Sequence, residues 1–377
     1  MLIGIDGLPL TSRRTGVGHY TFELAHALAL IAPDEQFSLI SQSPFHATVL
    51  AEIKTAPLLN LGLKNPATTL ISRRWWAIGL PLYLKRAGID LFHGTNYDVP
   101  LWNKRRNIIT VHDLSIFSHP EKHKDDIGRR ARRRLPIMIR STARIITPTE
   151  SVKREIVERF GTEPDKITVI PEAARQAFRP AHLHETAETR RRLDIKNDFI
   201  LFVGTIEPRK NLSTLVRAFA QVTRRTSRQL QLVIAGGQGW LMDDFHLLIN
   251  EAGIRDFVRM TGYLDDEDLR ALYSSCKVFV YPSLYEGFGL PPLEAMACGA
   301  PVIASRISAL SETLEDSALF IDPTDVEAVA KTIVDLLENE EQRIRLASRG
   351  LKHAARFSWE KTARLTLEAY YQVLGKT

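Results

Sequence analysis

Two glutamates, Glu286 and Glu294, stand eight residues apart in a stretch rich in glycine and proline. Carboxylates accept hydrogen bonds from neighbouring hydroxyls, so Glu286 suits a sugar ring and Glu294 a ribose. The apolar run Val278–Tyr281 predicts a buried strand before them, and Pro291 and Pro292 predict a helix with Glu294 in its first turn. Ligands of open α/β sheets bind at such strand ends. Alternatively, Glu294 only complements the helix dipole and Glu286 is an ordinary loop charge.

A pair of cations, Arg209 and Lys210, follows a second apolar run, Phe199–Gly204. A helix is predicted directly after them, over Leu212–Val222. Cations at a helix N-terminus that follows a strand can bind a diphosphate and neutralise the charge that grows on a leaving group. The alternative is that both are ordinary surface charges.

The N-terminus predicts a strand, a glycine loop and a helix: Leu2–Ile5, then Gly16 and Gly18, then a helix from about His19. This order is typical of phosphate-binding Rossmann-type units, in which main-chain N–H groups bind the phosphate. The dinucleotide fingerprint is incomplete, because its third glycine position holds Thr21, and this counts against a dehydrogenase. A flexible connection without a ligand is the alternative.

The pair His112-Asp113 directly follows another predicted strand, Ile108–Val111. A histidine at the carboxyl end of a strand can contact a sugar hydroxyl or a phosphate. Taken alone, these residues favour the alternative of a purely structural histidine.

The acidic run Asp265-Asp-Glu-Asp268 contains an Asp-x-Asp pattern, which binds a metal and a sugar nucleotide in some transferases. Because an amphipathic helix pattern follows, Asp265 is instead predicted to cap that helix. No metal is therefore expected.

The segment from Glu286 through Glu294 to Ala297 resembles the Glu-x7-Glu signature of glycosyltransferase family 4, whose members are retaining enzymes with the GT-B fold. The resemblance implies that Glu286 binds the donor sugar and Glu294 the nucleotide ribose. The loop Thr205–Asn211 is most similar to a bacterial branch that transfers mannose from GDP-mannose to polysaccharide or lipid-linked sugars.

The same resemblance implies roles for further residues. Catalytic roles fall to His112, Arg209, Lys210 and Glu286. Substrate-binding roles fall to Gly16, Gly18, Asp113, Tyr263, Leu264, Gly287, Phe288, Gly289, Leu290 and Glu294. No metal and no cofactor are implied, since the nucleotide sugar is a substrate; a same-face reaction assisted by the leaving phosphate is expected.

The 377 residues carry a formal net charge of +6 with a pI near 9.3, which favours anionic partners. A dense basic run, Arg129–Arg134, is expected on a helix that also contains Arg140 and Arg144. It is either a solvated face or a surface for an anionic membrane or a diphosphate-linked acceptor. Nucleic acid is not expected, because no aromatic platform accompanies these charges.

A second membrane hypothesis concerns Arg73 and Arg74, which precede Trp75 and Trp76 in an apolar stretch. Arginines beside tryptophans suit a membrane interface, whereas a partly buried helix would pack the tryptophans in the core. The apolar runs are too short to span a bilayer, and the chain starts directly with a strand instead of a secretory signal. Two cysteines without metal spacing fit buried thiols in a reducing compartment.

We therefore expect an α/β protein of two Rossmann-like domains facing an interdomain cleft. Residues 1–178 form the acceptor-side domain, residues 195–358 the nucleotide-sugar-binding domain, and residues 359–377 a helix that packs back on the first domain. The expected partners are a nucleotide sugar and a glycan or polyprenyl-diphosphate-linked acceptor, in the cytoplasm or at the inner face of the cytoplasmic membrane. A UDP-sugar donor, an epimerase, a phosphorylase and a non-catalytic sugar-nucleotide-binding protein are the alternatives.

Overall fold

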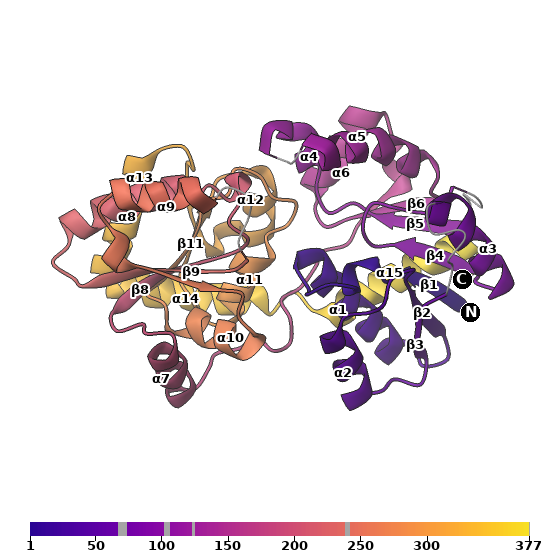
Figure 1. Cartoon of the computed structure of the whole chain (residues 1–377), viewed down its shortest axis with the longest axis horizontal. Helices are drawn as coiled ribbons and strands as arrows, with labels where there is room; N and C mark the ends of the chain where they lie inside the picture. The colour runs from indigo at the N-terminus through magenta and orange to yellow at the C-terminus, as the bar shows by residue number, and fades with distance from the viewer. Residues whose placement is uncertain (67–73, 102–105, 123–124, 238–241, 377) are drawn as a thin grey trace. The chain divides into compact units, whose positions relative to one another are not determined.

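A computed structural model describes residues 1–66, 74–101, 106–122, 125–237 and 242–376 (Figure 1). The chain divides into two compact units. Unit 1 comprises Met1–Glu172 and Ser358–Thr377, and unit 2 comprises Ala173–Phe357. Residues 173–178, which the sequence analysis assigned to the first domain, thus belong to unit 2. The reason is local: Phe178 is buried in the hydrophobic core of unit 2.

Unit 1 contains a seven-stranded parallel sheet in the order β3-β2-β1-β4-β5-β6-β7. This is the doubly wound order, in which the chain reverses direction across the sheet between β1 and β4. The strands are β1 (Leu2–Asp6), β2 (Gln36–Ile40), β3 (Leu61–Lys64), β4 (Leu91–Gly94), β5 (Asn107–Thr110), β6 (Arg144–Thr147) and β7 (Ile167–Val169). They are mostly buried, as both faces of a parallel sheet are covered by helices.

The helices of unit 1 include the C-terminal helix α15, which packs against α1 beside the sheet (Figure 1). A buried hydrogen bond of 2.7 Å between the Tyr370 hydroxyl of α15 and Nδ1 of His93 in β4 also ties α15 to the sheet. The described helices are α1 (Gly16–Ile31), α2 (Ala47–Thr55), α3 (Leu80–Arg86), α4 (Ser115–Ser118), α5 (Asp125–Arg140), α6 (Glu150–Phe160) and α15 (Trp359–Leu374).

Unit 2 repeats the same plan with a six-stranded parallel sheet in the order β10-β9-β8-β11-β12-β13. Its switch point lies between β8 and β11. The strands are β8 (Asp198–Val203), β9 (Leu230–Ala235), β10 (Val258–Gly262), β11 (Val278–Tyr281), β12 (Val302–Ser305) and β13 (Leu319–Ile321). The helices are α7 (Leu183–Arg192), α8 (Leu212–Arg225), α9 (Met242–Glu251), α10 (Asp266–Ser275), α11 (Leu290–Ala297), α12 (Ser308–Leu314), α13 (Val326–Glu338) and α14 (Glu340–Ala354).

Two expectations about surface segments are corrected. The basic run lies on α5, but that helix ends at Arg140, and Arg144 belongs to strand β6. The tryptophan pair lies in a π-helical turn, Trp75–Gly79, and Trp75 is 5% exposed within a small core cluster. Packing in the core, and not a membrane interface, therefore accounts for Trp75. Arg73 lies outside the described residues.

The lengths and hydropathies of the helices also bear on whether the chain could cross a membrane. Among the helices that the structure describes, none is both long and apolar enough to cross a bilayer.

Candidate functional site

The loops after β8 and β11 bring the predicted charged residues of unit 2 together. These two strands are neighbours in the sheet, so their carboxyl ends meet at its switch point. Arg209 and Lys210 form a short 3-10 turn after β8, and Glu286 lies in the loop after β11. Arg209 and Lys210 thereby become direct ionic partners of Glu286, from which they are separated by 77 and 76 positions in the chain.

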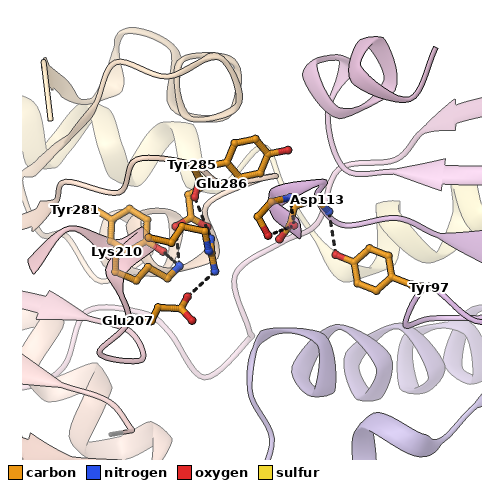
Figure 2. A network of polar contacts seen from close by, with 9 residues as sticks. Tyr97, Asp113, Glu207, Lys210, Tyr281, Tyr285 and Glu286 are labelled. Carbon is orange, nitrogen blue, oxygen red and sulfur yellow. Dashed lines mark hydrogen bonds and ion pairs between the residues drawn. The ribbon is translucent and has the colours of Figure 1, made fainter. Parts of the chain in front are cut away.

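Lys210 and Arg209 share the two carboxylate oxygens of Glu286 (Figure 2). Lys210 Nζ lies 2.6 Å from Oε1 of Glu286 and donates to the Tyr281 hydroxyl at 2.7 Å. Arg209 Nη1 lies 3.1 Å from Oε2 of Glu286, and its Nη2 lies 2.7 Å from Glu207 Oε1. Two cations thus face two carboxylates, and a diphosphate that entered here would compete with Glu286 for the same donors.

Burial makes these charges strongly interdependent, since the Glu286 side chain is only 9% exposed. Burial alone would favour the neutral carboxyl group, but attraction to Lys210 and then to Arg209 outweighs it. The pKa of Glu286 consequently falls from 4.5 to about 2. Glu286 is therefore ionised at neutral pH, and both of its carboxylate oxygens act as hydrogen-bond acceptors.

Asn211 links the loop after β8 to the loop after β11 by hydrogen bonds. It adopts the left-handed conformation, with φ of 55°, where asparagine is among the tolerated residues. Its side-chain amide donates to the carbonyl oxygens of Pro282 at 3.1 Å and Pro323 at 2.7 Å. The Leu284 N–H also donates to the Arg209 carbonyl at 2.9 Å. The cations therefore sit on a loop that is fixed to the loop of Glu286.

Glu294 lies close to a different set of partners. It is the fifth residue of α11, which begins at Leu290, so the expectation that it lies in the first turn is wrong. Its Oε1 accepts from Arg175 Nε at 3.2 Å and its Oε2 from the Tyr273 hydroxyl at 3.2 Å. Arg175 also pairs with Asp266. Burial raises the pKa of Glu294 above its ordinary value, and Arg175 opposes that rise.

The residues between the two glutamates shape the loop mainly through their backbone. Gly289 has φ of +102°, and a Cβ there would lie 2.4 Å from Leu310 Cδ2, so only glycine fits. Phe288 is 5% exposed and belongs to the hydrophobic core, so its side chain is directed away from solvent. Gly287 is buried and Leu290 half-buried. A ligand would meet this loop chiefly as main chain.

Tyr263 and Leu264 follow β10, whose last residue, Gly262, has φ of +72°. Tyr263 is 41% exposed, whereas Leu264 packs partly against the core. The following Asp265 accepts from the Asp268 N–H at 2.9 Å and caps α10. The prediction that this acidic run is a helix cap is therefore confirmed.

In unit 1, the glycines lie inside α1 and not before it. The helix begins at Gly16 instead of His19, and Thr15, at its N-cap, is extended. Helix geometry leaves the first N–H groups, including those of Gly16 and Gly18, without a partner inside the helix. A Cβ on Gly18 would lie 3.0 Å from the Pro9 carbonyl oxygen, which explains the glycine there. This helix end can bind an anion through its main chain.

His112 follows β5 and is 11% exposed. Its Nδ1 lies 2.8 Å from Glu172 Oε1, and its Nε2 lies 2.9 Å from the Thr95 carbonyl oxygen. The ring of Tyr20, a residue of α1, meets the imidazole edge-on at 4.6 Å. The structure therefore joins His112 to the helix that begins with the two glycines.

Asp113 organises the next turn of chain. Its Oδ1 accepts from the N–H of Ser115 at 2.8 Å and from the Ser115 hydroxyl at 2.7 Å, at the start of α4. Its own N–H donates to the Tyr97 hydroxyl at 3.1 Å (Figure 2). Tyr97 has φ of 63°, which is unusual for a tyrosine. The Asp113 side chain thus supports the loop that follows His112.

Sequence reasoning missed two residues that contact the predicted site residues. Glu172 is bonded to His112, and Arg175 to Glu294, yet both lie in a polar segment that has no periodic pattern. The available signal was positional: Glu172 follows the end of β7, just as His112 follows the end of β5. Charged residues after parallel strands meet at one edge of the sheet.

The chemistry of the arrangement is electrostatic. Unit 2 offers two adjacent cations and two buried glutamates, and unit 1 offers a helix N-terminus and a buried histidine. Such groups bind phosphates and hydroxyls and stabilise charge on a leaving group. Within the described ranges, no cluster of three or more His, Cys, Asp or Glu residues has the arrangement of a metal site.

Two family models match separate halves of the chain. Residues 14–174 match the model of glycosyltransferase family 4, and residues 185–353 match the model of glycosyl transferases group 1.

Similar proteins agree with these matches. O-antigen chain mannosyltransferase B of Escherichia coli is 32% identical over 382 residues, which cover 96% of this chain and 97% of that protein. The serotype-specific mannosyltransferase WbdA of Escherichia coli is 32% identical over 277 residues, which cover 71% of this chain and 34% of WbdA. The crystal structure of Anabaena Alr3699/HepE in complex with UDP and glucose has a TM-score of 0.77 at 17% identity, covering 98% of this chain and 99% of that one.

Proposed function

The chain belongs to glycosyltransferase family 4, and we propose that it transfers mannose from GDP-mannose to a glycan acceptor with retention of the anomeric configuration. It is a nucleotide-sugar-dependent hexosyltransferase with the GT-B fold. The expectations of family and fold are thereby confirmed. The observation that carries the mannose proposal is the 32% identity to an O-antigen mannosyltransferase over 96% of the chain.

The cluster around Glu286 supports the assignment of roles. Arg209 and Lys210 stabilise the departing diphosphate, because the cations that now pair with Glu286 can exchange one anionic partner for another. Glu286, ionised and freed from one cation, accepts hydrogen bonds from the sugar, and Glu294 accepts from the ribose hydroxyls. Because two cations supply the charge stabilisation, the reaction proceeds without a metal ion or an added cofactor.

In unit 1, the proposal assigns roles to the backbone at the start of α1 and to His112. The N–H groups of Gly16 and Gly18 at the start of α1 bind donor phosphate or sugar, as the dipole of a helix N-terminus favours. Exposed arginines of α5 (Arg130, Arg133 and Arg140) support a further part of the proposal, an acceptor linked to a polyprenyl diphosphate at the inner face of the cytoplasmic membrane.

A donor screen tests the proposal. The melting temperature is measured with GDP-mannose, UDP-glucose, UDP-N-acetylglucosamine, GDP and UDP, in the presence of EDTA. A ligand at 100 times its Kd stabilises the folded protein by about 2.7 kcal/mol, which such a screen detects. Stabilisation by GDP and GDP-mannose alone is the expected result. Stabilisation by UDP and a UDP-sugar alone would replace the donor by the UDP-sugar class, to which the ligand named for Alr3699/HepE points.

A further inference from the structure

The imidazole of His112 has a hydrogen-bond acceptor at each of its nitrogens. Nδ1 lies 2.8 Å from the Glu172 carboxylate, and Nε2 lies 2.9 Å from the carbonyl oxygen of Thr95. A carbonyl oxygen and an ionised carboxylate only accept, whereas a neutral imidazole carries a single N–H. Both contacts are satisfied together when both ring nitrogens are protonated. The geometry therefore indicates an imidazolium ion.

A second histidine of the same sheet provides the contrast. His93 is fully buried, and its nitrogens lie 2.7 Å from the Tyr370 hydroxyl and 2.7 Å from the Thr110 hydroxyl. Hydroxyl groups donate as well as accept, so they satisfy a neutral ring. Burial, and next the repulsion by His112, lowers the pKa of His93 to about 3. The partners, and not burial, thus distinguish the two histidines.

The groups that face His112 all favour its charged form or are neutral. The rings of Tyr20 and Tyr97 meet it edge-on at 4.6 and 6.1 Å. Burial alone would lower the pKa of His112, but the hydrogen bond and the charge of Glu172 outweigh burial, and Asp113 adds a smaller attraction. The pKa of His112 therefore lies above its ordinary value of 6.5.

We propose that Glu172 is a positioning residue that keeps His112 doubly protonated, so that His112 serves the sugar-transfer reaction as a fixed cation and not as a proton acceptor. Glu172 is 5% exposed, and it is the last residue of unit 1 before the chain enters unit 2. Its hydrogen bond therefore joins His112 to the segment at which the chain leaves unit 1. The role of His112 in sugar transfer rests on the proposed function, whereas its protonation by way of Glu172 does not.

The consequence for the reaction is specific. A fixed cation stabilises the negative charge that grows on the departing diphosphate, but it has no lone pair to accept the proton of the acceptor hydroxyl. As the bond from the sugar carbon to the phosphate oxygen breaks and the bond to the acceptor oxygen forms, the proton of the hydroxyl passes to the departing diphosphate. Proton transfer to His112 is excluded.

The substitution Glu172→Gln tests the proposal with little change in shape. The glutamine amide can donate an N–H to Nδ1, and His112 then becomes neutral while its Nε2–H still binds Thr95. With ¹⁵N-labelled histidine, NMR titration of the wild type should show His112 protonated on both nitrogens at pH 7, with a midpoint above about 6.5. In Glu172→Gln the midpoint should fall, and His93 should stay neutral in both proteins.

The pH profile of kcat supplies the functional readout. The wild-type kcat should decrease at alkaline pH, with the same midpoint as the NMR titration of His112. In Glu172→Gln this decrease should occur at lower pH. The substitution should also reduce kcat by roughly tenfold to a hundredfold and leave the KM for the donor nearly unchanged. Glu172→Asp, which restores the charge, should recover part of the loss. Glu327→Gln is the matched control, because Glu327 pairs with Arg225 on the surface of unit 2.

Two results would overturn the inference: a neutral His112 in the wild type at pH 7, or a midpoint that Glu172→Gln leaves unchanged. Both are read by NMR without any substrate. If the protein transferred no sugar from any donor, the proposed function would fail while these titrations would still decide the protonation of His112.

Discussion

The ionic cluster of unit 2 and the histidine pair of unit 1 hold their charges in different ways. Around Glu286, two cations face two carboxylates, and Glu286 keeps one cation when the other turns to a ligand. Around His112, the two ring nitrogens are bonded to a carboxylate and a main-chain carbonyl of the same unit. The first arrangement is suited to binding and releasing an anion, and the second to keeping one charge in one place.

This difference implies that the two groups of residues affect different kinetic quantities. Substitutions in the cluster of unit 2 should affect both the binding of the donor and the stabilisation of its leaving group. Substitutions around His112 should change the rate and its pH dependence while donor binding stays nearly constant. The predictions below take the effects on activity in unit 2 first, from the larger to the smaller, and then the effects on stability in both units.

The largest effect is expected for Lys210→Met, which removes a buried cation from the Tyr281 hydroxyl and leaves Glu286 with Arg209 as its single cationic partner. Loss of one group that stabilises charge in the transition state costs about 10²–10³ in rate. We expect kcat/KM for the donor to fall by that factor in a mannosyl-transfer assay. Lys331→Met, in an exposed pair with Asp335, is the control and should keep full activity. Near-normal turnover of Lys210→Met would remove the assigned role.

A smaller and different effect is expected for Glu294→Gln. The amide keeps the shape and one acceptor oxygen, but the hydrogen bonds to a ribose lose the charge that strengthens them. The donor Kd should rise by about tenfold, equivalent to about 1.4 kcal/mol, while kcat changes less. Calorimetric titration with the nucleotide and with the free sugar separates the two sites. A Glu294→Gln protein that bound the nucleotide normally would contradict the ribose assignment.

The remaining effects concern stability instead of activity, and they appear in opposite pH ranges. Because the folded pKa of Glu286 is lowered from 4.5 to about 2, its contribution is complete above pH 4.5 and is lost as the pH falls towards 2. Because the pKa of His112 is raised, its contribution is complete below pH 6.5 and is lost as the pH rises through the folded pKa.

Urea unfolding at a series of pH values measures both contributions. Glu286→Gln should flatten the dependence of the unfolding free energy on pH between 4.5 and 2, by up to about 3 kcal/mol over the range. Glu172→Gln should flatten it only above pH 6.5. Slopes that match the wild type in both ranges would contradict the described ion pairs.

The comparison also shows what the sequence was able to predict. The residues of unit 2 were found because Arg209, Lys210 and Glu286 lie in short motifs directly after apolar strands, and a parallel sheet brings such strand ends together. The doubly wound order of both sheets follows from the same alternation of strands and helices. Strand positions such as Val278–Tyr281 were therefore predicted correctly.

Ion pairs between residues far apart in the sequence could not be predicted from local motifs. Glu172 pairs with His112 across 60 positions, and Arg175 with Glu294 across 119, and no periodicity marks either residue. The predicted helix starts differ from the observed ones where the local backbone conformation changes: Thr15 before α1 is extended, and Gly289 before α11 has positive φ. Burial of Trp75 depended on the strands that it meets in the tertiary structure, which its neighbours in the sequence do not specify.

The central claim is that this chain transfers mannose by means of the cationic pair of unit 2, without a metal. The most direct test is an NMR assay with ¹³C-labelled GDP-mannose, a mannose-terminated lipid-linked oligosaccharide and EDTA. The account predicts release of GDP and a new mannoside with the anomeric configuration of the donor, formed by the wild type and about 10²–10³ times more slowly by Lys210→Met. A product of inverted configuration, or transfer that appears only when a divalent metal is added, would contradict it.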